Sequence, residues 1–329
     1  MSESGYVPVR LGAFAALVGT PAVLLAWTLA ERGLVSGATG LETLLVLTGG
    51  VAATAEYDRA VHASTGSHGV AAAVPSLGRT DAAAVSAAVA AAVLTHVLGV
   101  HVGFGPVVAS ALVGLVAGLV LPEVDAAAYC GSFVGMASVA LFSDVAYLVA
   151  AGLLAGLAFV VSRGVFDGYG GKLGTTAFFG CATTAALTTA DYAVGSALPW
   201  AAASAAVPVA AAGAVATTVL SRRFGVGSVV ASALVGLVAG LVLPPLLPGT
   251  GATLATVAFC ASFAGMSSTD RLGSLMHVAL AGGVSGVVFV GVTAAFPGAG
   301  GKLGTVAFVS CVSVVGLERL RTGRVPSVA

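Results

Sequence analysis

One apolar segment of this chain occurs twice, letter for letter. The string VVASALVGLVAGLVLP fills residues 107–122 and returns at 229–244. Two further pairs of matches follow in the same order, 129–138 with 259–268 and 166–175 with 296–305. The offset grows from 122 to 130, so the second copy carries about eight extra residues, PLLPGTGA near 245–252, whose composition predicts a loop. The chain is therefore predicted to contain one structural unit twice.

The repeated segments are too apolar for a water-facing protein. Hydrophobic residues make up 58% of the chain and charged residues only 8%, whereas a soluble domain carries roughly 25% charged residues. We therefore predict an all-α polytopic protein of the cell membrane, with the lipid bilayer as its main partner. The 46 glycines favour close helix packing in lipid, and Gly/Ala faces would also suit a homo-oligomer. A net charge of zero without a basic tract argues against nucleic acid as a partner.

About twelve apolar runs are separated by polar or Gly/Pro breaks, and each is close to the length of a membrane-spanning helix. The predicted segments are 11–30, 41–57, 81–103, 107–122, 126–142, 145–163, 173–192, 199–220, 229–244, 253–268, 274–293 and 303–318. The connection 58–80 is predicted to be a polar linker. The short pairs 107–142 and 229–268 leave two alternatives open, because they either cross the membrane fully or form re-entrant hairpins.

The distribution of basic residues predicts the orientation of these segments. With the N-terminus inside, eleven basic residues fall inside and only Arg32 and Lys302 fall outside. The inside set is Arg10, Arg59, Arg79, Arg163, Lys172, Arg222, Arg223, Arg271, Arg319, Arg321 and Arg324. This bias predicts an even number of crossings and two cytoplasmic termini.

The unit holds five segments, and an odd number of crossings reverses the orientation of the second copy. We expect N-terminal helices and a cytoplasmic loop in 1–80, a first repeat in 81–198 and an inverted second repeat in 199–329. Lys172 then lies inside and its counterpart Lys302 outside, as inversion requires. Segment 41–57 weakly echoes 173–192, so the frame of the repeat could also begin one helix earlier.

The first candidate site is the motif Ser-Phe-x-Gly-Met-x-Ser, which both copies retain. Interrupted helices that meet at the membrane midplane are a recurring location of transporter binding sites. If helical, the two serines and the glycine share one face and could line a narrow polar path. Close packing of small residues is the competing interpretation. The candidate residues are Ser132, Phe133, Gly135, Met136 and Ser138, with Ser262, Phe263, Gly265, Met266 and Ser268 in the second copy.

The second candidate site is the glycine-rich motif Gly-x-Gly-Gly-Lys-Leu-Gly-Thr, which precedes the last segment of each copy. Its backbone N–H groups at a helix start would suit an anion or a carbonyl group. A glycine turn with a lysine reaching the interface is the equally weighted alternative. The candidate residues are Gly170, Gly171, Lys172, Gly174 and Thr175, with Gly300, Gly301, Lys302, Gly304 and Thr305 in the second copy.

The remaining polar residues suggest neither catalysis nor a cofactor. No HExxH or GxSxG motif is present, and Cys130, Cys181, Cys260 and Cys311 lie singly in apolar runs, which is typical of buried thiols. We therefore expect no enzyme, no cofactor and no metal site. The few ionisable groups in apolar runs, Glu42, Glu56, His96, Asp144 and His277, form no evident relay.

The sequence therefore predicts a transporter or channel for a small solute or ion, with its pathway between the two repeats. The lack of a buried carboxylate chain slightly favours a channel or facilitator over an ion-coupled pump. The alternatives are a non-transporting membrane scaffold or sensor and, less favoured, an intramembrane enzyme. The five-plus-five layout resembles that of several transporter and channel classes, urea channels and amino-acid symporters among them, in architecture alone.

Overall fold

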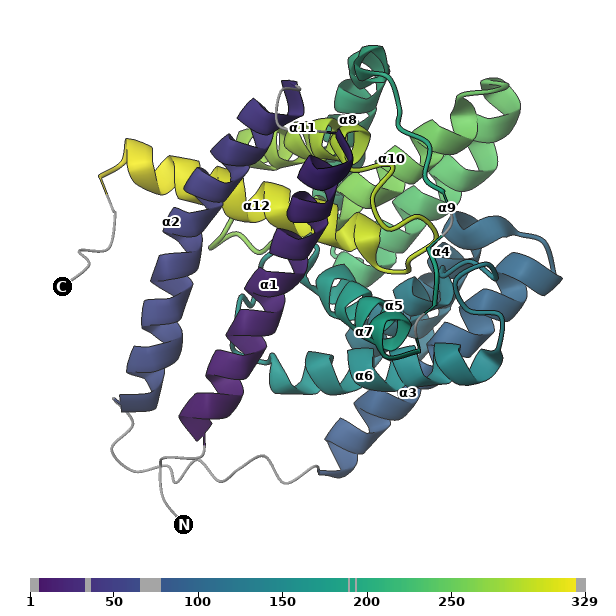
Figure 1. Ribbon diagram of the computed structural model, residues 1–329, viewed down its shortest axis with the longest axis horizontal. Helices are drawn as coiled ribbons and strands as arrows, with labels where there is room; N and C mark the ends of the chain where they lie inside the picture. The colour runs from purple at the N-terminus through teal and green to yellow at the C-terminus, as the bar shows by residue number, and fades with distance from the viewer. Residues whose placement is uncertain (1–5, 33–36, 66–77, 189, 193, 324–329) are drawn as a thin grey trace.

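The structure is a computed structural model that describes residues 6–32, 37–65, 78–188, 190–192 and 194–323. Every regular element in these ranges is a helix, which confirms the all-α prediction (Figure 1). The α-helices are α1 (Tyr6–Arg32), α2 (Gly37–Thr65), α3 (Arg79–His96), α4 (Gly105–Val120), α5 (Asp125–Gly135), α6 (Val145–Val161), α7 (Lys172–Thr188), α8 (Ala203–Arg223), α9 (Ser228–Leu246), α10 (Gly251–Gly265), α11 (Leu275–Gly291) and α12 (Lys302–Arg321). A π-helical turn, η2 (Val97–His101), extends α3, and a 3₁₀ turn, η3 (Trp200–Ala202), leads into α8.

Among the described residues, five helical stretches are long and apolar enough to cross a membrane by length and composition. They are Val9–Ala30, Arg79–His101, Trp200–Arg223, Ser228–Leu246 and Lys302–Arg321, and several apolar helices of 10–17 residues accompany them. Large apolar side chains lie exposed on several helices. Leu47 on α2, Leu119 on α4 and Val238 on α9 are 65%, 67% and 59% exposed. Such surfaces are compatible with contact to lipid.

Each predicted apolar segment corresponds to one α-helix, with three differences. Helix α2 continues through Thr65, so the first part of the predicted linker 58–80 is helical, and 66–77 lies outside the described residues. Helix α5 ends at Gly135, well before the predicted end at residue 142. The insertion at 245–252 adds a turn to α9 and begins α10, with only a short turn between them, where Gly251 N–H donates to Leu247 O at 2.7 Å.

The two matching stretches of sequence adopt matching conformations. Helices α6 and α11 begin at equivalent residues, and α7 and α12 begin at the equivalent lysines Lys172 and Lys302. Phe166 and Phe296, just before the glycine motifs, are the non-glycine residues with positive φ in the described structure, at 53° and 48°. Identical strain at equivalent positions indicates that the glycine loop of each copy folds in the same way.

Contacts between the two halves are reciprocal. The amide of Ser138 donates to the Gly298 carbonyl at 2.9 Å, and that of the equivalent Ser268 donates to the Gly168 carbonyl at 2.8 Å. Helices α4 and α9 also pack reciprocally, since Gly118 lies against Val230 and Gly240 against Val108. Contacts in which residue i meets residue j of the other copy, and j meets i, are the pattern that a local twofold axis produces.

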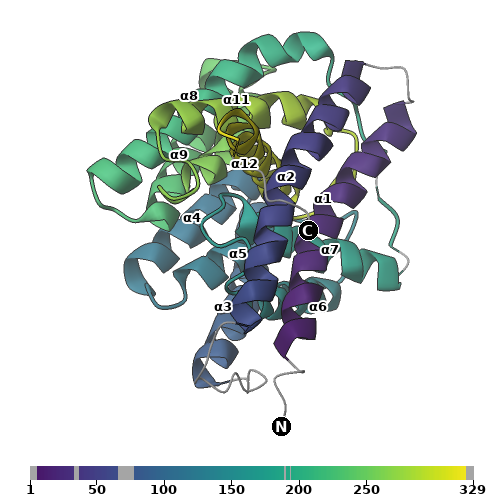
Figure 2. The same ribbon diagram turned by 90° about the vertical axis from the view of Figure 1, so that its left-hand side faces the viewer.

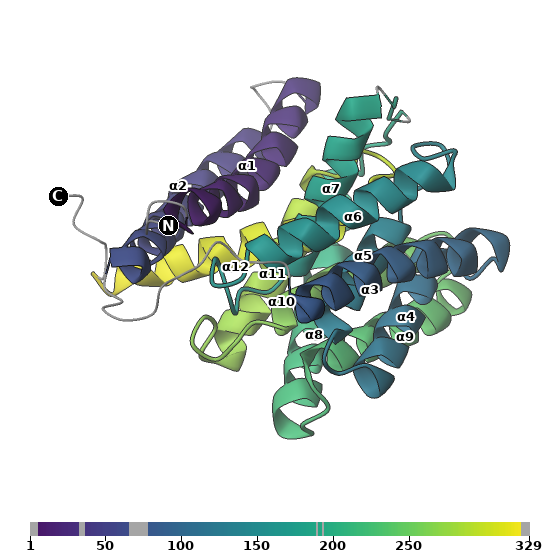
Figure 3. The same ribbon diagram turned by 90° about the horizontal axis from the view of Figure 1, so that it is seen from below.

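Helices α1 and α2 form an antiparallel pair on one side of the molecule, in front of α12 (Figures 1 and 2). Helices α4 and α9 lie side by side at the opposite end (Figure 3). Gly316 of α12 allows α2 to pack closely, because a β-carbon there would lie 1.8 Å from the Thr48 carbonyl oxygen. The N-terminal pair therefore covers α12 and leaves the interface between the halves in the interior.

Candidate pathway between the two halves

Four aromatic rings fill the centre of the interface between the halves. Phe133 of α5 and its equivalent Phe263 of α10 pack with ring centroids 4.7 Å apart. Tyr129 and Phe259, one helical turn earlier, complete the cluster at 4.4 and 4.8 Å from Phe133 and Phe263. All four side chains are at most 2% exposed. This aromatic cluster closes the interface at its centre.

Serine hydroxyls line the buried face next to the rings. Ser132 of α5 is 2.9 Å from Ser110 of α4, and the equivalent Ser262 of α10 is 2.7 Å from Ser232 of α9. Tyr129 joins the halves, because its hydroxyl is 3.0 Å from Ser232. Phe259, at the position equivalent to Tyr129, has no hydroxyl. The hydrogen bonds among these hydroxyls are therefore equivalent in the two halves, except for the one made by the Tyr129 hydroxyl.

The glycine loops meet at the same axis. A β-carbon at Gly174 would lie 2.4 Å from the Gly304 Cα, and one at Gly304 would lie 2.4 Å from the Gly174 Cα. Gly171 and Gly301 have φ of 84° and 82°, a region that side chains rarely adopt. Glycine is thus required here both by backbone contact across the axis and by backbone conformation.

The two predicted motifs contact each other crosswise between the halves. Besides the Ser138–Gly298 and Ser268–Gly168 bonds, the Gly170 amide donates to the Ser267 hydroxyl at 2.9 Å. Each glycine loop therefore rests on the segment that follows the short helix of the other half. Gly300 occupies the place equivalent to Gly170, where a β-carbon would lie 2.4 Å from the Phe133 carbonyl oxygen.

The lysines of the glycine motifs bond to carbonyl groups of their own halves. Lys172 Nζ donates to the Ser162 carbonyl at 2.7 Å and to Asp167 Oδ1 at 2.5 Å. Lys302 Nζ donates to the carbonyls of Thr293 and Ala295 at 3.0 and 2.7 Å. These carbonyls follow the C-terminal ends of α6 and α11, where a cation is stabilised by the helix dipole. Both lysines thus hold the glycine loop to the preceding helix.

The serine–glycine stripe predicted on one helical face is interrupted. Helices α5 and α10 end at Gly135 and Gly265, so Ser138 and Ser268 lie beyond the helix and use their backbone amides across the interface. Gly135 and Gly265 instead pack against the carbonyls of Ala92 and Ala214. Thr175 and Thr305 are buried and bond back to the carbonyls of Gly171 and Gly301. Whether these residues contact a solute stays a prediction.

A cavity of about 250 Å³ brings residues of both motifs together. The first half contributes Phe133 and the loop Gly168–Gly174, and the second half contributes Phe263 and Met266. Met136, the equivalent of Met266, is the C-cap of α5. Arg163 and Asp167 also line the cavity, and their side chains are 51% and 61% exposed, so this end reaches the surface. The cavity runs from the surface to the phenylalanine pair.

One polar atom in this cavity lacks a partner. The Tyr169 hydroxyl is buried and has no hydrogen-bond partner among the described residues. Burial raises the pKa of Tyr169, so the hydroxyl stays protonated and can both donate and accept. Neither Tyr169 nor the serine pair Ser110 and Ser232 was recognised as a candidate from the sequence. Ser110 and Ser232 could have been recognised in the sequence as hydroxyl-bearing residues within apolar runs.

Among the described side chains, the other ionisable residues named from the sequence cap a helix, form ion pairs or lie next to a helix end. Asp144 caps α6 by accepting from the Ala146 amide at 2.8 Å, and His277 lies 3.7 Å from Glu318. Glu56 is buried but paired with Arg59 and Arg271. His96 is buried next to η2, and the Glu42 side chain lies outside the described residues. The four cysteines are free and buried, as predicted.

The described residues contain no group of three or more His, Cys, Asp or Glu side chains placed to hold a metal ion. Comparisons with protein-family models, with curated proteins and with solved structures found no match.

Proposed function

We propose that this protein is a multi-pass transporter or channel of the cell membrane that carries a small solute or ion between its two halves. In this proposal both termini are cytoplasmic, and the halves are inverted repeats that share an axis in the membrane plane. Five observations support it.

Helix α1 contacts equivalent residues of the two halves near its opposite ends. Phe14 near its start stacks on Phe166 at 5.5 Å, and Trp27 near its end packs on Phe296 at 4.7 Å. Phe166 and Phe296 are equivalent residues of the two halves. Thirteen residues of helix separate their partners, a rise of about 20 Å. Equivalent loops at opposite ends of a spanning helix are what an inverted pair requires.

The charged contacts support the same orientation. Segments that carry basic residues predicted inside contact one another. Arg271 pairs with Glu56 of α2 and donates to the Asp167 carbonyl at 2.9 Å. Arg163 pairs with Asp81 at the start of α3, and Arg10 lies against Gly164. A cytoplasmic face that carries most of the basic residues follows from the positive-inside rule. The Arg32 side chain and Arg324 lie outside the described residues.

The short helices support the re-entrant alternative. Helix α5 has 11 residues, a length of about 16 Å, whereas the hydrocarbon core is about 30 Å thick. It ends at the interface, as does its equivalent α10. Interrupted helices from both repeats that meet inside the membrane are a recurring feature of transporter binding sites.

The central lining favours a facilitator. The groups at the centre of the interface are aromatic rings, hydroxyls and backbone amides. The charged residues that line the cavity are Arg163, Asp167 and Lys172, and the last two pair with each other. An uncharged lining suits a small solute that exchanges hydrogen bonds with water for bonds to hydroxyls and carbonyls. The phenylalanine pair closes this route, so the structure corresponds to a closed state of the proposed pathway.

The observation that carries the proposal is the cavity itself, because residues of both duplicated motifs line it and it ends on Phe133 and Phe263. The test is flux into liposomes that contain the purified protein, with a panel of small neutral solutes, anions and cations. Phe133→Ala and Phe263→Ala remove the rings that close the cavity. Phe224→Ala, at an exposed position outside the interface, is the matched control.

We expect at least one solute to enter faster than into empty liposomes, with both interface variants changing that rate and the control leaving it unaltered. Absence of protein-dependent flux for the whole panel, in the wild type and in both variants, would reject the pathway. That result would favour a scaffold or sensor.

A further inference from the structure

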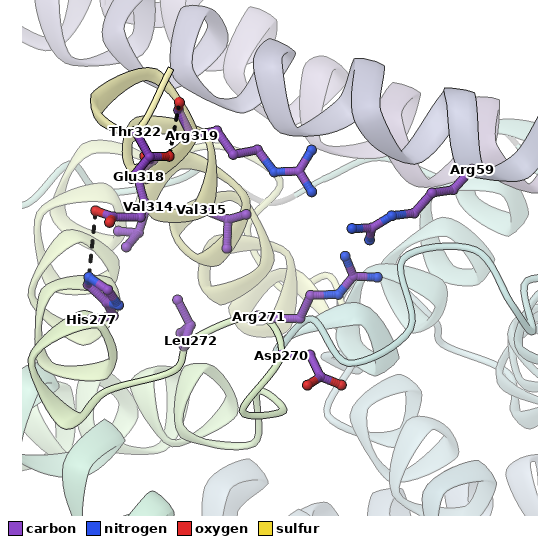
Figure 4. A pocket seen from close by; sticks show the side chains of 10 residues that line it. All are labelled: Arg59, Asp270, Arg271, Leu272, His277, Val314, Val315, Glu318, Arg319 and Thr322. Atoms are coloured by element: carbon purple, nitrogen blue, oxygen red, sulfur yellow. Dashed lines mark hydrogen bonds and ion pairs between the residues drawn. The ribbon is translucent and has the colours of Figure 1, made fainter. Parts of the chain in front are cut away.

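A second cavity, of about 440 Å³, shares no lining residue with the first. Helix α2, the connection between α10 and α11, and the C-terminal part of α12 form its wall. Three arginines from these three elements line it: Arg59, Arg271 and Arg319. Figure 4 shows their guanidinium groups directed toward one another across the same space.

The arginines differ in how firmly they are held. Arg271 is only 12% exposed, donates to both carboxylate oxygens of Glu56 at 2.5 and 3.2 Å, and lies 4.4 Å from the centre of the Tyr169 ring. Arg59 shares Glu56 at 2.5 Å. The guanidinium of Arg319 makes no ion pair or hydrogen bond with any residue that the structure describes. Two guanidinium groups that pair with Glu56 therefore face a third that has no partner among the described residues.

Two acidic residues, Asp270 and Glu318, also line this cavity, but no ion pair joins either of them to Arg59, Arg271 or Arg319 among the described residues. Arg59 and Arg271 share the single carboxylate of Glu56. Glu318 lies near His277 and Arg321, at 3.7 and 4.0 Å, and the Asp270 carboxylate points away from the arginines in Figure 4. Like charges at close range repel, so the cluster is costly unless an anion joins it.

We propose that this arginine cavity binds a phosphate group. Guanidinium groups offer paired N–H donors that match phosphate oxygens, and several arginines around one anion give charge-assisted hydrogen bonds. The phosphate could belong to an anionic lipid headgroup or to a soluble phosphate. The cavity lies on the face that carries the predicted cytoplasmic arginines, where anionic lipids are attracted to basic residues. This site shares no lining residue with the cavity of the proposed pathway, although Arg271 also contacts Tyr169 there, and phosphate binding is tested independently of transport.

The test compares Arg319→Gln with Arg321→Gln. Arg321 lies on the same helix, is 73% exposed and does not line the cavity, so it controls for the loss of one positive charge. In one arm, the thermal unfolding midpoint of the protein in neutral detergent is titrated with inorganic phosphate against chloride at equal ionic strength. In the other arm, bound phosphatidylglycerol and phosphatidylcholine are counted by native mass spectrometry of protein from mixed-lipid nanodiscs.

We expect saturable binding of phosphate or preferential retention of phosphatidylglycerol by the wild type, weakened about tenfold in Arg319→Gln and unchanged in Arg321→Gln. An effect in both arms assigns the site to phosphate in general, and an effect in the nanodiscs alone assigns it to the lipid headgroup. Circular dichroism and gel filtration establish that each variant is folded, and Arg59→Gln provides a second variant of the same cavity. The proposal would be overturned if Arg319→Gln and Arg321→Gln bound phosphate and phosphatidylglycerol equally well. It would also be overturned if the wild type preferred neither phosphate over chloride nor phosphatidylglycerol over phosphatidylcholine.

Discussion

At the scale of single residues, the contact of Gly174 and Gly304 places a reciprocal requirement on the sequence. A methyl group at either position would meet the other backbone at 2.4 Å. We expect Gly174→Ala and Gly304→Ala each to lower the free energy of unfolding by about 1–3 kcal/mol through overpacking. Gly50→Ala on α2, where no atom lies within 4 Å of the added carbon, is the control. The free energy of unfolding is measured in detergent. If all three variants were equally stable, Gly174 and Gly304 would not be in close backbone contact.

The single hydroxyl that breaks the twofold pattern gives a second prediction at this scale. Tyr129→Phe removes the bond to Ser232 and makes the aromatic cluster match its equivalent in the other half. Ser232 keeps its bond to Ser262, so we expect a loss of about 1 kcal/mol in the free energy of unfolding. Tyr147→Phe, at a partly exposed position on α6, should leave stability unchanged. A gain in stability for Tyr129→Phe would show that the hydroxyl is not satisfied as described.

At the scale of elements, the attachment of α2 depends on one buried carboxylate. Glu56 is 3% exposed and pairs with Arg271 of the second half, which is 12% exposed. Glu56→Gln would leave a buried guanidinium without its counter-charge, at a cost of about 3 kcal/mol. Glu123→Gln, at an exposed position, is the control. Thermal unfolding in detergent compares the two, and equal midpoints would mean that the ion pair contributes nothing to the packing of α2.

The helices were largely predictable, because apolar runs mark their positions in the chain. The end of α5 was not, because residues 136–142 are nearly as apolar as the helix before them. The bond from Ser138 to Gly298 lies across the interface, and nothing local in the sequence records it. Helix α2 was predicted too short for the opposite reason. Its last turns carry Asp58 and Arg59, and hydropathy identifies only the apolar part of a helix.

The candidate site was predictable in composition and not in arrangement. The duplication identified both motifs, and Phe133 and Phe263 lie where the halves meet. The crosswise contact between the serine motif of one half and the glycine loop of the other required the tertiary structure, as did the bonds of Lys172 and Lys302 to carbonyls. The sequence also could not predict that the Tyr169 hydroxyl has no hydrogen-bond partner among the described residues, because such partners come from segments far apart in the chain.

At the scale of the whole molecule, the proposed function requires two copies of one unit that face opposite sides of the membrane. The reciprocal contacts and the positions of Phe166 and Phe296 along α1 support this arrangement. It predicts that every pair of equivalent surface residues is divided between the two sides. It also predicts that the surface end of the 250 Å³ cavity opens to the cytoplasm.

The most direct measurement is the sidedness of two equivalent positions in the glycine loops. Asp167→Cys and its counterpart Pro297→Cys are introduced singly into a chain whose four native cysteines are replaced by alanine. Each is treated with a membrane-impermeant thiol reagent in intact cells and in inside-out vesicles. Inverted halves predict that Cys at 167 reacts only in the inside-out vesicles and Cys at 297 only in intact cells. Reaction of both from the same side would contradict the inversion and remove the basis for a pathway between the halves.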